Sequence, residues 1–395
     1  MALLRIAEPR PRLENRFALF DLGFRPFYLL ASIFAALSVP LWALQFSGLL
    51  SRPYLTGAVW HAHEMLFGFT LAVIVGFLFT AGSNWSGQPT PKGWWLAGIA
   101  ALWTLARILV LTPFAWAAAA VNVAVPLTAA IALAIPFVKS GNRRNYFFVG
   151  LLCLMAVACA LVHLSQMGVL PPVSGLAIQV ALDIVLFIMA VMAGRVIPMF
   201  TNNGVPGAGA SKHPTLEKAA LGSVLVLMVA DALALHGAAL ATVATVAMAA
   251  HLGRWLRWHP WNTRKAPMVW VLHLAYLWVP IHLLLRALAE SGIVAASAAT
   301  HALTVGAAGG LVIGMMTRTA RGHTARPVCA DGVDVACYVL VAAAAAVRVA
   351  LPLAAPAQTL PAVWASALLW SAGFALYAIR YWPVLTRPRL DGRPG

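Results

Sequence analysis

The sequence contains few charged residues, and acidic residues are the scarcer kind. Of its 395 residues, 10% are Asp, Glu, Lys or Arg and 62% are hydrophobic, whereas about a quarter of the residues of a soluble domain are charged. No long polar segment is present to form the surface of a soluble core. Repeated apolar stretches of about 20 residues instead predict membrane-spanning helices. These proportions favour an all-α membrane protein over a soluble fold.

Cysteine is also scarce, since the chain has four and none forms a CxxC motif. Cys153 and Cys159 lie inside one apolar stretch, where small core residues are expected, and Cys329 and Cys337 flank a predicted loop. Any metal ligands are therefore expected to be histidines. The sequence also lacks a phosphate-binding loop, a dinucleotide fingerprint and a nucleophile elbow. Its N-terminal residues lack the apolar core of a signal peptide.

Twelve apolar stretches predict transmembrane helices, which together form a single bundle over residues 1–395. One of the longest apolar regions, 216–256, is too long for one spanning helix and is divided at His236-Gly237. The fold class is therefore predicted to be an all-α polytopic membrane protein of about twelve helices. The predicted spans are 24–46, 60–80, 93–111, 115–138, 147–169, 176–199, 216–235, 238–256, 267–289, 297–317, 332–352 and 358–381.

The net charge is +16 at pH 7, and the basic residues concentrate in every second loop between the predicted spans. Such alternation is the topology signal of the positive-inside rule. Because basic residues also precede the first span and follow the last, residues 1–23 and 382–395 are expected to be cytoplasmic. The charge thus predicts contact with a lipid bilayer, and binding of nucleic acid is not expected.

The most informative stretch is WHAHEMLFG, residues 60–68. Two histidines and a glutamate lie there at the start of an apolar run, and ionisable groups in a spanning segment are costly to bury and often functional. At about 100° per residue, His61 and Glu64 share one face of a helix, and His63 points about 200° away from His61. The stretch therefore offers either two ligating faces or one ligand and a supporting group.

Other ionisable side chains are predicted at the same depth, in the outer halves of five more spans. Imidazole suits copper, iron and haem, and a carboxylate beside a ligating histidine commonly fixes its tautomer. A lone histidine in a helix is more often a packed residue than a ligand, but several at one depth favour a metal site. The alternative is the polar substrate cavity of a transporter. These side chains are His163, His282, Arg286, His301, Asp183 and Asp231.

A second group of polar residues is predicted toward the cytoplasmic ends of the spans. Arginine pairs in a planar, bidentate way with carboxylates, so haem propionates, a quinone or an anion are candidate partners for Arg25 and Arg195. Ordinary anchoring at the membrane surface is the alternative. The group comprises Arg25, Arg195, His273, Arg318 and His323.

A set of motifs along the chain has a recognisable combination of residues. The motifs are GFRPFYLL, WHAHEMLFGF, TAGSNWSG, GRVIPMFTNN, LHLAYLWVP and HALTVGAAGGLVIGMMTRTARGHT. Together they resemble the NnrS family of bacterial membrane proteins, which have about twelve spans. The resemblance extends from the first predicted span to the end of the tenth. It implies a protein of the bacterial inner membrane that contains haem and copper and is associated with denitrification and tolerance of nitric oxide.

By this resemblance, the cofactors are haem b and copper, and Glu64 is the candidate catalytic residue, as a supporting partner or a proton carrier. His61, His63, His163 and His301 are the first choice as metal ligands. The candidate cofactor-binding residues are the residues of these motifs His61, His63, His273, His301, His323, Arg195 and Arg318, together with His163, which also fits the family, and Arg25 is added from its position.

Haem iron and copper both bind nitric oxide, so the combined hypothesis is a protein that binds nitric oxide and reduces it with electrons from a quinone or another donor. Two alternatives stay open at this point. A transporter or channel with a histidine-lined cavity would contain no metal. A nitric oxide sensor would bind haem without turnover, and nothing in the sequence separates it from an enzyme.

Overall fold

The computed structural model describes residues 16–49, 55 and 57–393, and within them all regular structure is helical. Twelve helical segments follow one another, which confirms the predicted all-α fold. In chain order they are α1 (Phe24–Phe46); α2 (Gly57–His63), η1 (Glu64–Thr70) and α3 (Leu71–Ser86), which are continuous; α4 (Gly93–Leu109); α5 (Ala115–Ser140); η2 (Arg143–Asn145) and α6 (Tyr146–Gln166); α7 (Ser174–Gly204); α8 (Pro214–Ala232); α9 (Ala238–Arg257); η3 (Pro260–Thr263) and α10 (Pro267–Glu290); α11 (Ala296–His301), η4 (Ala302–Gly309) and α12 (Gly310–Gly322), again continuous; α13 (Gly332–Ala354); and η5 (Pro356–Gln358) and α14 (Thr359–Thr386).

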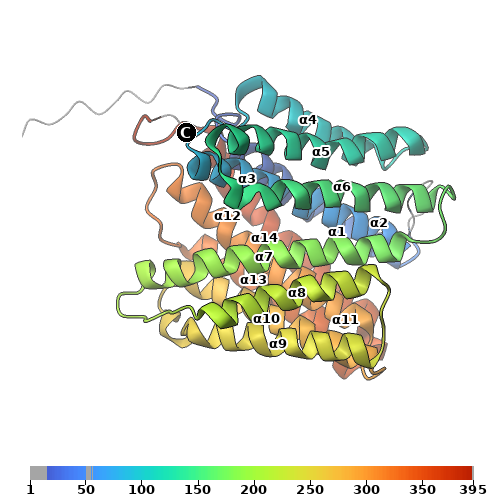
Figure 1. Ribbon diagram of the computed structural model, residues 1–395. Coiled ribbons are helices and arrows are strands. Elements are labelled where there is room, and N and C mark those ends of the chain that lie inside the picture. The colour runs from blue at the N-terminus through green and yellow to red at the C-terminus, as the bar shows by residue number, and fades with distance from the viewer. Residues whose placement is uncertain (1–15, 50–54, 56, 394–395) are drawn as a thin grey trace, which may run out of the picture.

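Ten of these segments are long and apolar enough to cross a membrane, counted over the described part of the chain. The other two are α4, which is shorter at 17 residues, and α8. Figure 1 shows the helices lying side by side along a common direction, joined by loops at the two ends of the bundle. The chain is therefore a multi-pass membrane protein, as its composition predicts.

The predicted break between the seventh and eighth spans is confirmed. α8 ends at Ala232 and α9 begins at Ala238, and two residues of the connection, Ala234 and Gly237, have φ angles of 52° and 68°. Helical backbone has φ near about −60°, so left-handed residues here stop the first helix and let the chain reverse direction. One boundary differs more, because the helix predicted to end at residue 80 continues to Ser86.

Among the ten described helices that could cross a membrane, the one formed by α2, η1 and α3 is the most enclosed. In the most apolar 18-residue stretch of this helix 83% of the residues are buried, compared with 33% in the corresponding stretch of α13. It packs against α1, α4, α5 and α7. A helix with neighbours on several sides can direct successive side chains to different partners, and this property determines where its two histidines point.

Two of the long helices contain π-helical segments. One, η1, begins at Glu64 directly after His63, and the other, η4, begins at Ala302 directly after His301. A π-helical turn rotates the residues before it relative to those after it, and such turns are frequent at functional sites. Both helices also carry a His-Ala pair at this point, at 61–62 and 301–302. The two helices thus share a dipeptide and a π-helical segment, which begins three residues after His61 and one residue after His301.

The two ends of the bundle differ in charge. One end, which we call the basic end, carries the C-terminal residues, the α5–α6 turn and the α7–α8 loop (left in Figure 1). The opposite end, which we call the far end, carries the α6–α7 and α10–α11 connections. α2 starts at the far end, so His61 and His63 lie near it.

Candidate functional site

Two histidines and a cysteine meet inside the bundle, and we call them the His63 cluster: His63, Cys159 and His163. His63 ends α2, whereas Cys159 and His163 lie one turn apart on α6 and so face the same neighbour. The Nε2 atoms of the two histidines are 3.0 Å apart, and the Cys159 Sγ lies 3.8 Å from the His63 Nε2. All three side chains are buried, and their ligand atoms lie within 4.8 Å of one another.

This spacing suits one shared metal ion. Metal–nitrogen bonds are about 2.0 Å long and metal–sulfur bonds about 2.3 Å, so small side-chain adjustments bring all three donors onto one ion. A thiolate combined with imidazoles is a soft donor set of the kind that selects copper(I) or zinc. The alternative without a metal is a hydrogen bond in which the two Nε2 atoms share one proton.

Three further side chains orient His63 through its Nδ1 atom, on the side of the ring away from the cluster. The Glu64 Oε1 lies 2.8 Å from the His63 Nδ1, and Arg107 of α4 donates to the same oxygen at 2.6 Å. Arg107 also donates to Asn122 of α5, whose amide in turn donates to the Ala118 carbonyl oxygen at 2.8 Å. Because an ionised carboxylate only accepts hydrogen bonds, the His63 Nδ1 carries the proton. The His63 Nε2 therefore presents its lone pair to the cluster, as metal-binding histidines require.

Gly68 makes this arrangement sterically possible. A Cβ atom at this position would lie 2.9 Å from the nearest guanidinium nitrogen of Arg107 and 2.8 Å from the Phe34 ring. The Gly68 carbonyl oxygen also accepts a hydrogen bond from the Trp103 indole at 3.1 Å. The π-helical segment η1 thus places Gly68 where α4 can approach closely and where Arg107 can reach Glu64.

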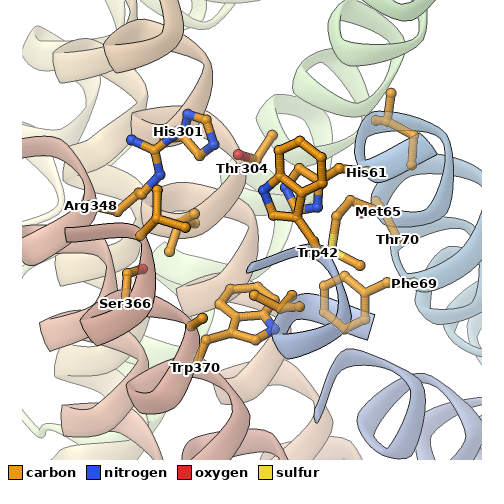
Figure 2. A pocket seen from close by; sticks show the side chains of 15 residues that line it. Trp42, His61, Met65, Phe69, Thr70, His301, Thr304, Arg348, Ser366 and Trp370 are labelled. Atoms are coloured by element: carbon orange, nitrogen blue, oxygen red, sulfur yellow. The ribbon is translucent and has the colours of Figure 1, made fainter. Parts of the chain in front are cut away.

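A second histidine pair faces a cavity on another side of α2, which we call the His61 cavity. His61 and His301 have ring centroids 6.5 Å apart and ring planes inclined by 14°, and Trp42 of α1 stacks on His61 at 4.8 Å. Figure 2 shows Trp42 and His61 on one side of the cavity and His301 with Arg348 on the other. The space between the walls is about 630 Å³, a figure that includes open solvent.

The His61 cavity offers donors that are not otherwise satisfied. The His301 Nδ1 lies 2.7 Å from the Ser297 carbonyl oxygen, so it carries the proton and leaves the Nε2 lone pair free. The His61 Nδ1 is buried without a hydrogen-bond partner among the described residues. Arg348 of α13 makes only a 3.5 Å contact with the Ser297 hydroxyl there. Two imidazoles and a guanidinium without an acidic partner in the described part of the chain therefore face one space.

The four histidines predicted as metal ligands thus separate into two pairs. His63 pairs with His163, and His61 faces His301. His61 and His63 lie on different faces of α2, as their separation of about 200° requires. Glu64 belongs with the first pair, through its contact with His63.

The other predicted site residues lie away from these two pairs, toward the basic end. Arg25 donates to the carbonyl oxygens of Leu385 (3.0 Å) and Arg387 (2.7 Å). The His273 Nε2 lies 2.8 Å from the Thr201 hydroxyl. The remaining contacts are Arg195 with the Asn145 side chain at 2.9 Å, Arg318 over the Phe200 ring at 3.8 Å, and His323 beside the Phe24 ring at 5.7 Å.

Asp183 and Asp231, the carboxylates other than Glu64 that were predicted at the outer depth, belong to a third group, separate from both histidine pairs. Arg286 of α10 pairs with Asp183 of α7 at 3.3 Å and with Asp231 of α8. His282, one turn earlier on α10, directs its Nδ1 to the Ala299 carbonyl oxygen at 2.8 Å. This group links three helices near the far end and supplies no carboxylate to either histidine pair.

Four residues of the two sites were not predicted from the sequence. They are Cys159, Arg107, Asn122 and Arg348. Cys159 precedes His163 by one helical turn, and this spacing was a usable signal. Arg107 and Arg348 are charged residues inside predicted spans, which is itself a sign of function. Asn122 has no comparable signal, because polar amides within apolar helices are commonly explained by packing.

One comparison with known proteins identifies a family. The model of the NnrS family, described as NnrS protein, matches residues 18–389 of the chain. A comparison with curated proteins gave no match. The family match includes every helix from α1 to α14 and hence both histidine pairs.

Proposed function

The chain belongs to the NnrS family, whose model matches nearly all of it, and on this basis we propose a haem- and copper-containing protein of the bacterial inner membrane that binds and reduces nitric oxide. Family membership and the buried His63 cluster together indicate metal binding and a role related to nitric oxide. The observation that carries the finer proposal is the 3.0 Å approach of the His63 and His163 nitrogens beside Cys159.

The His63 cluster is the proposed copper site. Its two imidazoles and one thiol are the donors that copper favours, and all three are shielded from solvent. The contact from Glu64 to the His63 Nδ1 supplies the outer partner that usually accompanies a metal-binding histidine. Arg107 balances the buried negative charge of Glu64, so the supporting group remains fixed whether or not metal is bound.

The His61 cavity is the proposed haem b site. His61 and His301 would hold the haem, and the buried Nδ1 of His61, which has no hydrogen-bond partner among the described residues, is the observation that supports a ligand there. The large aromatic walls, which include Phe69 and Trp370, suit a flat apolar macrocycle. Arg348 has the charge and the planar donors to bind a propionate.

When bound, haem iron and copper supply nitric oxide binding and one-electron transfer. Reduction of two nitric oxide molecules consumes two electrons and two protons and releases one nitrous oxide and one water. Glu64 is the ionisable carboxylate nearest the His63 cluster, where it holds the His63 tautomer through its hydrogen bond. The same contact makes Glu64 the candidate for delivering a proton to the cluster. A quinone or another membrane donor would supply the electrons.

The proposed orientation puts the basic end in the cytoplasm and both histidine sites toward the outer face of the inner membrane, following the positive-inside rule. It is tested with reporter domains fused after Gly395 and inserted in the α6–α7 connection. The orientation requires a cytoplasmic reporter to be active at the first position only. If that reporter were active only in the α6–α7 connection, the orientation of the protein would be the opposite of the one proposed.

The function is tested on detergent-purified protein by optical spectra before and after dithionite reduction, with iron and copper measured on the same sample. The proposal requires a Soret band that shifts on reduction, both metals near one per chain, and consumption of nitric oxide with added reductant. A nitrosyl complex without consumption would identify a sensor. A colourless protein that cannot be loaded with metal would contradict the proposal and favour a transporter, for which flux across vesicles is the next measurement.

A further inference from the structure

A pocket at the basic end is lined almost entirely by polar and basic side chains. It lies between the end of α3, the α5–α6 turn, α7 and the α7–α8 loop, so four separate segments build it. None of its residues belongs to the His63 cluster or the His61 cavity. Its lining residues are Trp85, Asn142, Arg144, Asn145, Arg195 and Lys212.

The pocket contains three cations and no acidic lining residue in the described chain. Glu217 is the acidic side chain that most affects Lys212, but both of its carboxylate oxygens are engaged by Arg254, at 3.1 Å and 3.0 Å. Elsewhere at this end, Arg321 is neutralised by Asp331 and Asp334, each at 2.6 Å. Among the described residues, the cations of the pocket therefore have no ion-pair partner, whereas Arg254 and Arg321 do.

Arg195 is held in a fixed position at the centre of the pocket. It donates to the Asn145 side-chain oxygen at 2.9 Å, and its guanidinium lies 5.6 Å from the ring centroid of Trp85. Asn145 donates to Asn142 at 3.1 Å, and Asn142 donates to the Trp85 carbonyl oxygen at 2.9 Å. This chain of amides fixes the guanidinium before any ligand arrives, and its other N–H groups remain available for an anion.

The cations of the pocket also repel one another. Partial burial lowers the pKa of Lys212, and Glu217 acts in the opposite direction. The positive charges of Arg254, Arg144 and Arg195 lower this pKa further. A bound anion would relieve this repulsion, so the pocket is electrostatically prepared for negative charge.

An apolar exposed strip begins directly beside the pocket. Tyr146 follows Asn145 at the start of α6 and is 37% exposed, and Leu154 and Val157 further along α6 are 45% and 55% exposed. Gly150 lies between them on the same face, with open space where a side chain would stand. A polar pocket continued by an apolar strip along a spanning helix matches a ligand with an anionic headgroup and a hydrocarbon chain.

We propose that this pocket binds the phosphate group of an anionic phospholipid, with Arg195 and Lys212 as its principal contacts. Arginine matches the geometry of a phosphate, and basic pockets between helices on the cytoplasmic side commonly recognise lipid headgroups. An acyl chain would lie along the exposed face of α6. The site is independent of the proposed metal chemistry, because neither histidine pair contributes to it.

The proposal is tested by native mass spectrometry of the full-length protein, titrated in detergent with phosphatidylglycerol or, separately, with phosphatidylcholine. We expect one tightly held phosphatidylglycerol and no comparable phosphatidylcholine. Lys212→Gln is expected to weaken this binding about fivefold, and Arg195→Gln by at least as much. The matched control is Lys265→Gln, which removes one exposed positive charge from the same end and should change little.

Three outcomes would overturn the proposal. Equal weakening by Lys212→Gln and Lys265→Gln would mean that the lipid responds only to the general surface charge. Equal binding of the two lipids would remove the role of the anionic headgroup. Displacement of the lipid by inorganic phosphate at equal concentration would identify a soluble phosphate as the ligand. Since Lys212 is exposed and lies in a loop, its variant keeps the test valid even if Arg195→Gln fails to fold.

Discussion

The two histidine sites differ in how their polar groups are satisfied. In the His63 cluster, each ring nitrogen of His63 has a partner within 3.0 Å, and Glu64, Arg107 and Asn122 continue the network into α4 and α5. In the His61 cavity, one His61 nitrogen has no partner among the described residues, and Arg348 lacks an acidic one. The first site is a closed, preformed network, whereas the second has an open space with unused donors.

This contrast indicates two different kinds of ligand. A closed network of three donor atoms within 4.8 Å has room for a single ion. A cavity with facing imidazoles, aromatic walls and a guanidinium that lacks an acidic partner among the described residues suits the larger proposed group, which has its own polar edge. The two sites share the α2–η1–α3 helix, which directs His61 to one and His63 to the other.

The largest effect is expected from Arg107→Ala, which leaves Glu64 as an uncompensated charge in the closed network. Removing one partner of a buried ion pair typically costs about 3–5 kcal/mol. Thermal unfolding of the purified protein should show a marked decrease in Tm. The double variant Arg107→Leu with Glu64→Gln should recover much of the loss. A Tm unchanged by Arg107→Ala would show that the network does not stabilise the fold.

Glu64→Gln should lower metal affinity in addition to stability, because it also leaves Arg107 as a buried charge without its partner. The neutral amide still contacts His63 but no longer balances Arg107, and loss of such an outer partner typically costs about 10–100-fold in metal affinity. Copper affinity, measured by competition with a chelator, should decrease by this factor while haem content stays constant. Asp391→Asn in the exposed tail is the control. An equal loss of haem would mean that the two sites are not separable.

Arg348→Gln should affect only the open cavity. A charge-assisted contact in a partly open site contributes about 1 kcal/mol, or about a fivefold change in affinity. Haem should therefore transfer to apomyoglobin about fivefold faster from the variant, with copper unchanged. Arg348→Lys, which keeps the charge, should show a smaller change. If neither variant lost haem faster than the unmodified protein, Arg348 would be excluded as a haem contact.

The smallest effect is expected from Gly68→Ala. The added Cβ would lie 2.9 Å from the Arg107 guanidinium and displace it slightly from Glu64, so copper affinity should decrease by less than in Glu64→Gln. Gly98→Ala on the adjoining helix is the matched control, because nothing lies within 4 Å of its added Cβ. If both alanines leave copper affinity unchanged, the close approach at Gly68 has no role in positioning Arg107.

Much of the fold was predictable from the sequence because spanning helices need about 20 apolar residues and basic loops mark their ends. Even the short break between α8 and α9 followed from length. The end of the second span at Ser86 was missed, because polar residues such as Asn84 in the last turn resemble a loop. The two π-helical segments were also not predictable, since their residues are ordinary apolar helix formers.

The site was predictable only in part. The depth of each histidine followed from its place in a span and grouped His282 with His61, His63, His163 and His301. The family motifs, and not depth, left His282 out of the predicted ligands. Which histidines meet depends on how helices are ordered and rotated in the bundle, and a single sequence does not contain that information. Arg107 and Arg348 carried a usable signal, because charged residues inside spanning helices are often functional. Cys159 was predicted to be a core residue, and it is buried as expected. The structure also places its Sγ beside His63, which was not predicted.

Iron and copper contents of His63→Ala and His61→Ala, compared with the exposed variant His236→Ala, test the account most directly. If the two sites are separate, His63→Ala should lose copper and keep its Soret band, and His61→Ala should lose haem and keep copper. His236→Ala should retain both. The division into a closed metal centre and an open haem cavity would be contradicted if His63→Ala and His61→Ala each lost both metals. It would also be contradicted if both variants kept both metals.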